Sequence, residues 1–156
     1  MAAVGGVLLA AMAILAPVGA WAAPPERTAF SEHLLVIDAQ SCPFPIELDL
    51  QIWGTDTLFY DRHGDPETLL VKVRADGTNS AMGTTLQEHD VLNIRFDLTT
   101  DEVQTAGLPF RVKLPGGGIV IRDAGVVRFD EDRNVVFQGG PHPSLEGDVA
   151  AYCAAF

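Results

Sequence analysis

Apolar and polar residues alternate with a period of two along much of this 156-residue chain, and this alternation limits the fold more than any other feature. In residues 46–52 (IELDLQI) aliphatic side chains alternate with polar ones, as in a β-strand with one buried face. No helical periodicity separates the alternating segments. The same alternation, or a short apolar run, predicts strands over 30–37, 46–52, 69–74, 92–98, 110–114, 119–122, 126–129 and 135–137.

Turn-forming sequences separate these strands. Residues 61–65 (DRHGD) and 130–134 (DEDRN) are typical of hairpin loops, and 76–79 (DGTN) and 115–118 (PGGG) of breaks between strands. We therefore predict an all-β fold, an antiparallel meander of about eight strands closed or nearly closed into a small barrel, with a β-sandwich as the alternative. A short C-terminal helix is expected over 148–155.

The first 22 residues are interpreted as a signal peptide. Residues 1–25 carry no charge, 7–18 form an apolar run, and Ala20 and Ala22 place small side chains at positions −3 and −1 of a cleavage site. Residues 23–156 would then be a single secreted, extracellular β-domain. The leader lacks a basic residue before its apolar run and is long enough to span a bilayer, so a membrane-attached protein with an uncleaved N-terminal segment is the alternative.

The chain has two cysteines, Cys42 and Cys153, near the two ends of the expected mature domain. An even pair in an oxidising compartment usually forms a disulfide. Neither cysteine lies in a Cys-x-x-Cys pair or beside a basic residue, which disfavours the alternative of a reactive thiol. The sequence therefore predicts a structural bridge between them.

The charge of the chain restricts its partners. The net charge is −11; residues 26–102 carry 15 acids against 5 bases, whereas 111–133 carry 5 bases against 4 acids. Such a chain repels nucleic acid and anionic lipid at long range, so no nucleic-acid partner is expected. A small apolar ligand or an extracellular protein is the expected partner, and the sequence does not predict an oligomeric state.

Several of these segments resemble a pattern in uncharacterised secreted β-proteins of high-GC Gram-positive (actinobacterial) bacteria, a group with no established activity. The resemblance supports export, the cysteine pair and a β-architecture, and it implies no active site. The segments that carry it are 42–45 (CPFP), 59–64 (FYDRHG), 107–110 (GLPF), 115–118 (PGGG), 123–125 (DAG), 140–142 (GPH) and 152–155 (YCAA).

Four residues are candidates for a ligand site. Trp53, Phe59 and Tyr60 flank the Gly54 break and are expected at the rim of a barrel mouth, although core packing is the simpler role for such aromatic side chains. His142 lies between two prolines, which would hold it rigidly. No metal ligand is expected, because the four histidines are scattered and the acidic turn 130–134 lacks the Gly and Glu of an EF-hand.

No catalytic constellation is found. The glycines of 116–118 precede a strand and lack the Lys-Ser/Thr of a phosphate loop, and no serine lies in a Gly-x-Ser-x-Gly elbow. No cofactor is expected. The function remains unknown at this level; a non-enzymatic secreted binding or structural barrel, able to hold a small apolar ligand, is favoured. A cofactor-free isomerase or cyclase on such a barrel is the alternative, by analogy of fold alone.

Overall fold

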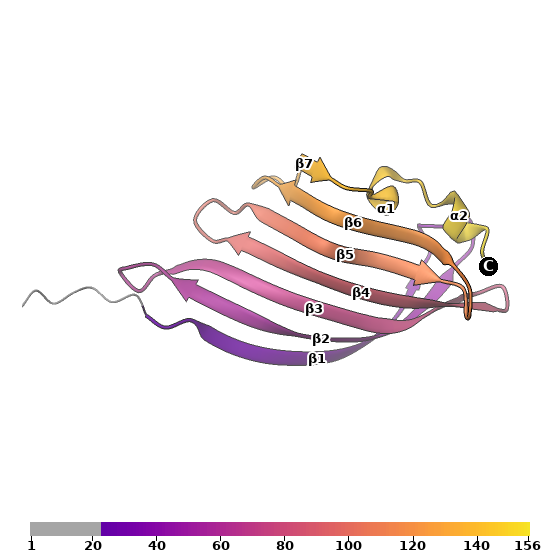
Figure 1. The fold of residues 1–156 in the computed structure, drawn as a ribbon, viewed down its shortest axis with the longest axis horizontal. Coiled ribbons are helices and arrows are strands. Elements are labelled where there is room, and N and C mark those ends of the chain that lie inside the picture. The colour runs from indigo at the N-terminus through magenta and orange to yellow at the C-terminus, as the bar shows by residue number, and fades with distance from the viewer. Residues whose placement is uncertain (1–22) are drawn as a thin grey trace, which may run out of the picture.

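The computed structural model describes residues 23–156, and within them the fold is one antiparallel sheet with two short helices (Figure 1). The predicted signal peptide 1–22 lies outside the described residues. The seven strands are β1 (Glu26–Asp38), β2 (Ile46–Tyr60), β3 (Pro66–Ala81), β4 (Thr84–Asp97), β5 (Val103–Lys113), β6 (Ile119–Phe129) and β7 (Val135–Gly139), and the helices are α1 (Pro143–Glu146) and α2 (Ala150–Cys153).

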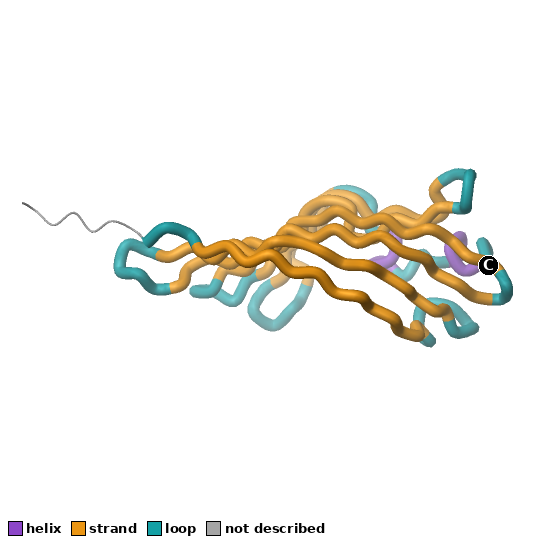
Figure 2. The backbone as a smooth tube through the Cα atoms, turned by 90° about the horizontal axis from the view of Figure 1, so that it is seen from below, coloured by secondary structure: helices purple, strands orange, loops and turns teal. Residues whose placement is uncertain are grey.

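The sheet is a meander in which every strand pairs with its sequence neighbours, in the order β1-β2-β3-β4-β5-β6-β7. The predicted all-β class and meander are therefore confirmed, but the expected barrel is wrong, and so is the alternative of a two-sheet sandwich. Closure requires the first strand to pair with the last. Instead β7 ends after five residues, and the chain then turns onto one face of the sheet, so that β1 and β7 remain edges (Figures 1 and 2).

Several strands are longer than the sequence predicts. Residues 76–79, expected to form a turn, lie inside β3, and the strands expected over 119–122 and 126–129 are one strand, β6. At Gly77 the missing side chain has a packing role, because a Cβ there would lie 2.0 Å from the carbonyl oxygen of Asp49 in β2. The glycine thus lets two strands approach closely within a continuous ladder.

Three predicted turns are confirmed, and a fourth was missed. The loops 61–65, 115–118 and 130–134 connect successive strands. The missed turn joins β3 to β4 through Met82 and Gly83, which both have positive φ, at 52° and 83°. Two consecutive residues with positive φ form the tight turn that matches the twist of a hairpin, and glycine usually occupies at least one of the positions.

The register divides the side chains between two faces, which we call the capped face and the open face. One register row of the capped face runs Leu50, Gly77, Glu88, Val112, Ile121 across β2 to β6. The open face is the opposite one, with the row Trp53, Arg74, Val91, Leu108 across β2 to β5. The polar sets of the predicted strands lie mainly on the open face.

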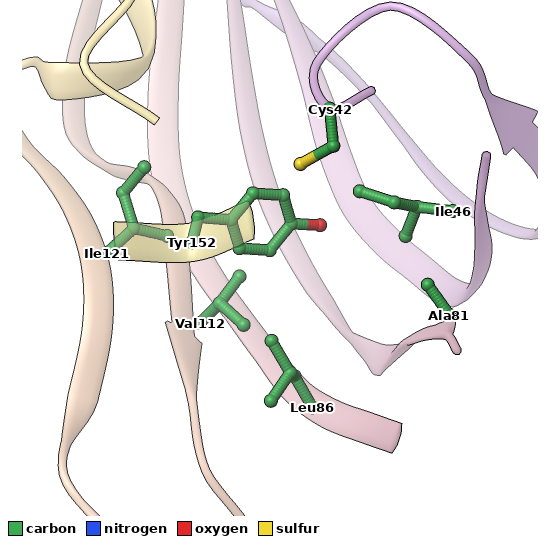
Figure 3. Close-up of a cluster of buried hydrophobic side chains, with 7 residues drawn as sticks. All are labelled: Cys42, Ile46, Ala81, Leu86, Val112, Ile121 and Tyr152. Atoms are coloured by element: carbon green, nitrogen blue, oxygen red, sulfur yellow. The ribbon is translucent and has the colours of Figure 1, made fainter. Parts of the chain in front are cut away.

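The main core lies at one end of the capped face, beneath the C-terminal segment. Tyr152 reaches from α2 into the middle of the cluster and is 2% exposed (Figure 3). Its ring makes edge-to-face contacts with Phe110 and Phe156. The buried members of the cluster are Cys42, Ile46, Ala81, Leu86, Val112, Ile121 and Tyr152.

The predicted disulfide joins Cys42 to Cys153, which are 111 positions apart in sequence, and so fastens the C-terminal segment to the loop before β2. The expected C-terminal helix is present over a shorter range, in α2. Helix α1 was not predicted; its four residues are framed by Pro143 at its start and by Gly147, which has a φ of 77°, at its end.

Within residues 23–156 no helix is both long and apolar enough to cross a bilayer.

Candidate functional site

The basic residues of this chain are segregated onto one face of the sheet. Of the ten Lys and Arg residues in the sequence, Arg62 and Arg133 lie in hairpin loops and all the others lie on strands. The register places each of these strand residues on the open face. Those on the four strands β3 to β6 are Lys72, Arg74, Arg95, Arg111, Lys113, Arg122 and Arg128, and we call this set the basic face.

Alternation along each strand explains this segregation. Lys72 and Arg74 are two residues apart in β3, as are Arg111 and Lys113 in β5, so both members of each pair share a face. The pairing of β4 with β3 and β5 then brings Arg95 onto the same side. The basic face is therefore a product of the register as well as of the local sequence.

The basic face has few acidic neighbours. In the described part of the chain the carboxylates of Asp49 and Asp76 each contact a histidine, His33 and His89 respectively, and no carboxylate forms an ion pair with Lys or Arg. Across β3 to β6 the open face carries two acids, Asp76 and Asp97. Asp76 is paired with His89, and Asp97 accepts hydrogen bonds from the Thr99 hydroxyl and from the backbone N–H of Thr99 and Thr100. In the described residues none of the seven cations forms an ion pair with a carboxylate, but Asp76 lines a cleft with Arg111 and Lys113, and Asp97 lines one with Arg95 and Arg128.

Two arginines of the basic face lie directly opposite each other. Arg111 in β5 pairs in register with Arg122 in β6. Like charges at directly opposite positions destabilise a sheet. In addition, the Nε atom of Arg111 is buried and has no hydrogen-bond partner.

Three clefts lie along the open face. The largest, of about 390 Å³, is lined by Asp76, Thr78, Gln87, His89, Arg111 and Lys113, with Gly77 and Glu88 completing the wall. The next, of about 350 Å³, is lined on this face by Trp53, Thr55, Lys72, Arg74, Val91 and Asn93. The third, of about 120 Å³, is lined by Arg95, Gln104 and Arg128 together with Asp97, Glu102 and Val103. Basic side chains line all three.

Arg128 has an additional contact at the β7 edge. Its guanidinium carbon lies 4.7 Å from the centre of the Phe137 ring. Such a cation–π contact holds the side chain without cancelling its charge.

The capped face carries two buried carboxyl groups in β4. Glu88 and Asp90 lie two residues apart in β4 and are each 6% exposed. A register shift in β5 near Pro109 leaves the backbone N–H of Arg111 to donate a 2.9 Å hydrogen bond to the Asp90 carboxylate. Burial, and then the neighbouring Glu88, raise the pKa of Asp90 to about 9, so Asp90 holds a proton at neutral pH.

The structure does not bring the four sequence-predicted site residues together. Trp53 lines the 350 Å³ cleft. Phe59 and Tyr60 lie at the far end of β2, where Tyr60 pairs with Pro66. His142 is 2% exposed at the start of α1, with its Nε2 atom 3.3 Å from the carbonyl oxygen of Gly139. Of the four, Trp53 alone lines any of the three clefts described above.

In the acidic turn 130–134 after β6, the Asp130 carboxylate is occupied by hydrogen bonds within the turn. The Asp130 carboxylate accepts bonds from the backbone and side-chain amides of Asn134. Throughout residues 23–156 no group of three or more His, Cys, Asp or Glu side chains is placed to hold a metal ion.

Sequence reasoning missed the basic face. Its signal was present, since Lys72, Arg74 and Arg95 belong to the polar sets of alternating strands, as do Arg111 and Lys113. Local alternation shows that such residues share a face along one strand. Whether neighbouring strands present their bases to the same side depends on register and bulges, which the sequence does not reveal.

No family model, curated protein sequence or solved structure matches this chain. The function is therefore argued from the geometry of the sheet.

Proposed function

We propose that this protein is exported and acts as a non-enzymatic binding protein whose ligand is anionic and lies on the basic face. The observation that supports this most is the gathering of seven basic side chains on one face without carboxylate partners. Asp and Glu number 21 against 10 Lys and Arg, so a random arrangement would place an acid beside most bases. In the part of the chain that the structure describes, none of the seven cations forms an ion pair with a carboxylate, although Asp76, Asp97 and Glu102 line two of the clefts.

A bound anion would offset the repulsion within the basic face. The opposed Arg111 and Arg122 raise the free energy of the folded sheet, and the neighbouring Lys113 adds to the effect. The clefts give a ligand partly enclosed positions beside these cations, where charge interactions are stronger than in open water. An anionic ligand thus explains both the charge and the shape of this face.

The earlier expectation of a small apolar ligand rested on a barrel interior. The open sheet has no such interior, and each of the three clefts carries two basic side chains and at least one amide side chain beside its other lining residues. Trp53 remains part of the proposed site, beside Lys72 and Arg74. Export rests on the apolar leader, and it agrees with the disulfide between Cys42 and Cys153.

The alternative of a cofactor-free isomerase or cyclase has one supporting observation, the proton that Asp90 retains at neutral pH. A general acid must reach its substrate. Asp90 and Glu88 are each 6% exposed on the capped face, and Asp90 lines none of the three clefts. Binding is therefore the function that we favour.

Chromatography on a sulfated matrix tests the proposal. Despite its net charge of −11, the purified protein should be retained at low salt, released as salt rises, and not retained on the uncharged matrix. The double variant Arg74→Glu/Arg122→Glu changes two exposed members of the basic face and should flow through.

The matched control is Arg62→Glu/Arg133→Glu, which makes the same charge change in the hairpin loops. This control should still be retained. If both double variants elute alike, net charge and not the basic face governs retention, and the proposal fails.

A further inference from the structure

We infer that the anionic ligand is an extended, sparsely charged polymer, an acidic polysaccharide that runs along the strands of the basic face. This inference rests on the anion-binding function proposed above and names the class of its ligand.

The extent of the basic face favours a polymer over a small anion. Arg95 pairs with Gln104 in one register row, and Lys113 pairs with Gln87 in another. The stretch of β4 from Arg95 back to Gln87 rises about 26 Å, because a strand advances roughly 3.3 Å per residue. Across β3 to β6 the face is about 14 Å wide at a strand spacing of about 4.8 Å. A single small anion touches only a fraction of this area.

The three clefts follow one another along this length. The cleft at Arg95 and Arg128 comes first, the Trp53 cleft with Lys72 and Arg74 comes next, and the cleft at Arg111 and Lys113 comes last. This order follows the register rows along β4, from Arg95 through Asn93 and Val91 to Gln87. A chain-like ligand could occupy successive clefts, with a negative group near each set of cations.

The side chains between the cations suit sugars. Asn93, Gln87 and Gln104 line the clefts, and their amides can both donate to and accept from hydroxyl groups. Trp53 offers an indole face against which the C–H groups of a sugar ring can pack. Each of the three clefts therefore combines cations with at least one amide side chain.

The same residues fit a nucleic acid less well. Binding of single strands depends on several aromatic side chains on which successive bases stack. Among Trp, Tyr and Phe, the three clefts are lined by Trp53 alone. The acidic body of the protein also repels a dense polyanion such as duplex DNA, with a charge about every 1.7 Å, more than a polymer with one charge per sugar.

Calorimetric titration with galacturonic acid, a short oligogalacturonate and polygalacturonate tests the inference. Affinity per binding site should rise with chain length, fall as salt increases, and be lost for fully methyl-esterified polygalacturonate, which has the same backbone without charge. Inorganic phosphate and oligothymidylate serve as the small-anion and nucleic-acid probes and should bind more weakly than polygalacturonate.

Two variants at opposite ends of the face examine the length of the contact. Arg95→Gln and Lys113→Gln should each weaken polygalacturonate binding by about 2- to 5-fold, as expected for exposed ion pairs. The double variant should show about the product of the two losses, since the sites are far apart. Arg62→Gln, in the hairpin between β2 and β3, should change nothing.

Four outcomes would overturn the polysaccharide inference: galacturonic acid or phosphate binding as tightly as the polymer, equal binding of the esterified polymer, tighter binding of oligothymidylate, or a loss confined to one end of the face. The proposed function is tested separately, by retention on the sulfated matrix and by the loss of that retention in Arg74→Glu/Arg122→Glu. None of the four outcomes alters that test. A protein that fails on that matrix as well would refute both proposals.

Discussion

The side-chain amide of Asn79 in β3 donates a 2.9 Å hydrogen bond to the hydroxyl of Tyr152 in α2, and both side chains are buried. This bond joins two residues 73 positions apart and fixes the C-terminal segment over the core. Burial raises the pKa of Tyr152, so its hydroxyl stays neutral. The Oδ1 atom of Asn79 has no partner, which leaves the amide dependent on Tyr152.

Tyr152→Phe should therefore destabilise the protein by about 1–3 kcal/mol, because it leaves a buried amide without a partner. Tyr152→Ala should cost more, about 3–5 kcal/mol, since it also empties the centre of the core. Urea unfolding measures both. Combining Tyr152→Phe with Asn79→Leu should recover part of the loss. A Phe variant as stable as the parent would mean that the hydrogen bond contributes nothing.

Breaking the disulfide should also loosen the C-terminal segment. Cys153→Ser should lower the free energy of unfolding by about 2–5 kcal/mol, because the bridge closes a long loop in the unfolded chain. Non-reducing peptide mapping of the parent protein should find the peptides of Cys42 and Cys153 linked. Two thiols that titrate without denaturant would contradict this prediction.

Mutations should show that the core is confined to the end of the capped face that lies beneath the C-terminal segment. Leu86 is fully buried, whereas Leu34 on the same face of β1 is 40% exposed. Leu86→Ala should cost about 2–5 kcal/mol. The matched change Leu34→Ala should cost less than about 1 kcal/mol, and thermal melts can compare the two. Equal losses would indicate that the β1 edge is covered in solution.

The buried carboxyl of Asp90 should make stability fall as pH rises. Its pKa is raised from 3.8 to about 9, so between these values the folded protein keeps a proton that the unfolded chain releases. The stabilisation is complete below about pH 4 and is lost on approaching pH 9, with a slope of at most about 1.4 kcal/mol per pH unit.

Denaturant midpoints measured across this range test the effect. Asp90→Asn should flatten the dependence, because the amide keeps an oxygen for the Arg111 N–H and has no proton to lose. The exposed-turn variant Asp65→Asn serves as the control and should keep the slope of the parent. A parent protein whose stability is constant over this range would show that Asp90 ionises normally.

Processing of the leader gives a further expectation. If residues 1–22 are a signal peptide, the protein recovered from culture medium begins at Ala23, and its intact mass corresponds to residues 23–156. Ala22→Leu should block cleavage by removing the small side chain at position −1. Recovery of the full-length chain in membranes alone would support the uncleaved anchor instead.

The sequence predicts the local features of this fold well and the long-range ones poorly. Alternation in residues 46–52 and the loop at 130–134 depend on neighbouring residues, and both are observed. The pair Cys42 and Cys153 could also be predicted, because no third cysteine competes. Gly77 is an example of a local pattern that misleads. A glycine beside an aspartate usually indicates a turn, but Gly77 lies inside a strand, where its missing side chain leaves room for the carbonyl oxygen of Asp49 in the neighbouring strand.

The site was harder to predict than the fold, for a related reason. Trp53 can be proposed as a site residue from the sequence because it is aromatic and flanks a glycine, and it does line a cleft. Arg111 and Arg122 are eleven residues apart in sequence and become neighbours only through the pairing of β5 with β6, after a shift in register. An acidic chain gives no compositional hint of a basic face, because net charge averages over both sides of the sheet.

The position of Tyr152 in α2, after all seven strands, sets an order of events during folding. Each strand pairs with the one made just before it, so the hairpins of the sheet can form as the chain emerges. The residue at the centre of the core arrives only after β7, and its hydrogen bond to Asn79 and the bridge through Cys153 come last. A chain interrupted between β7 and α2 would possess every strand of the sheet and still lack the side chain that completes the core, so pairing of the strands alone does not finish this fold.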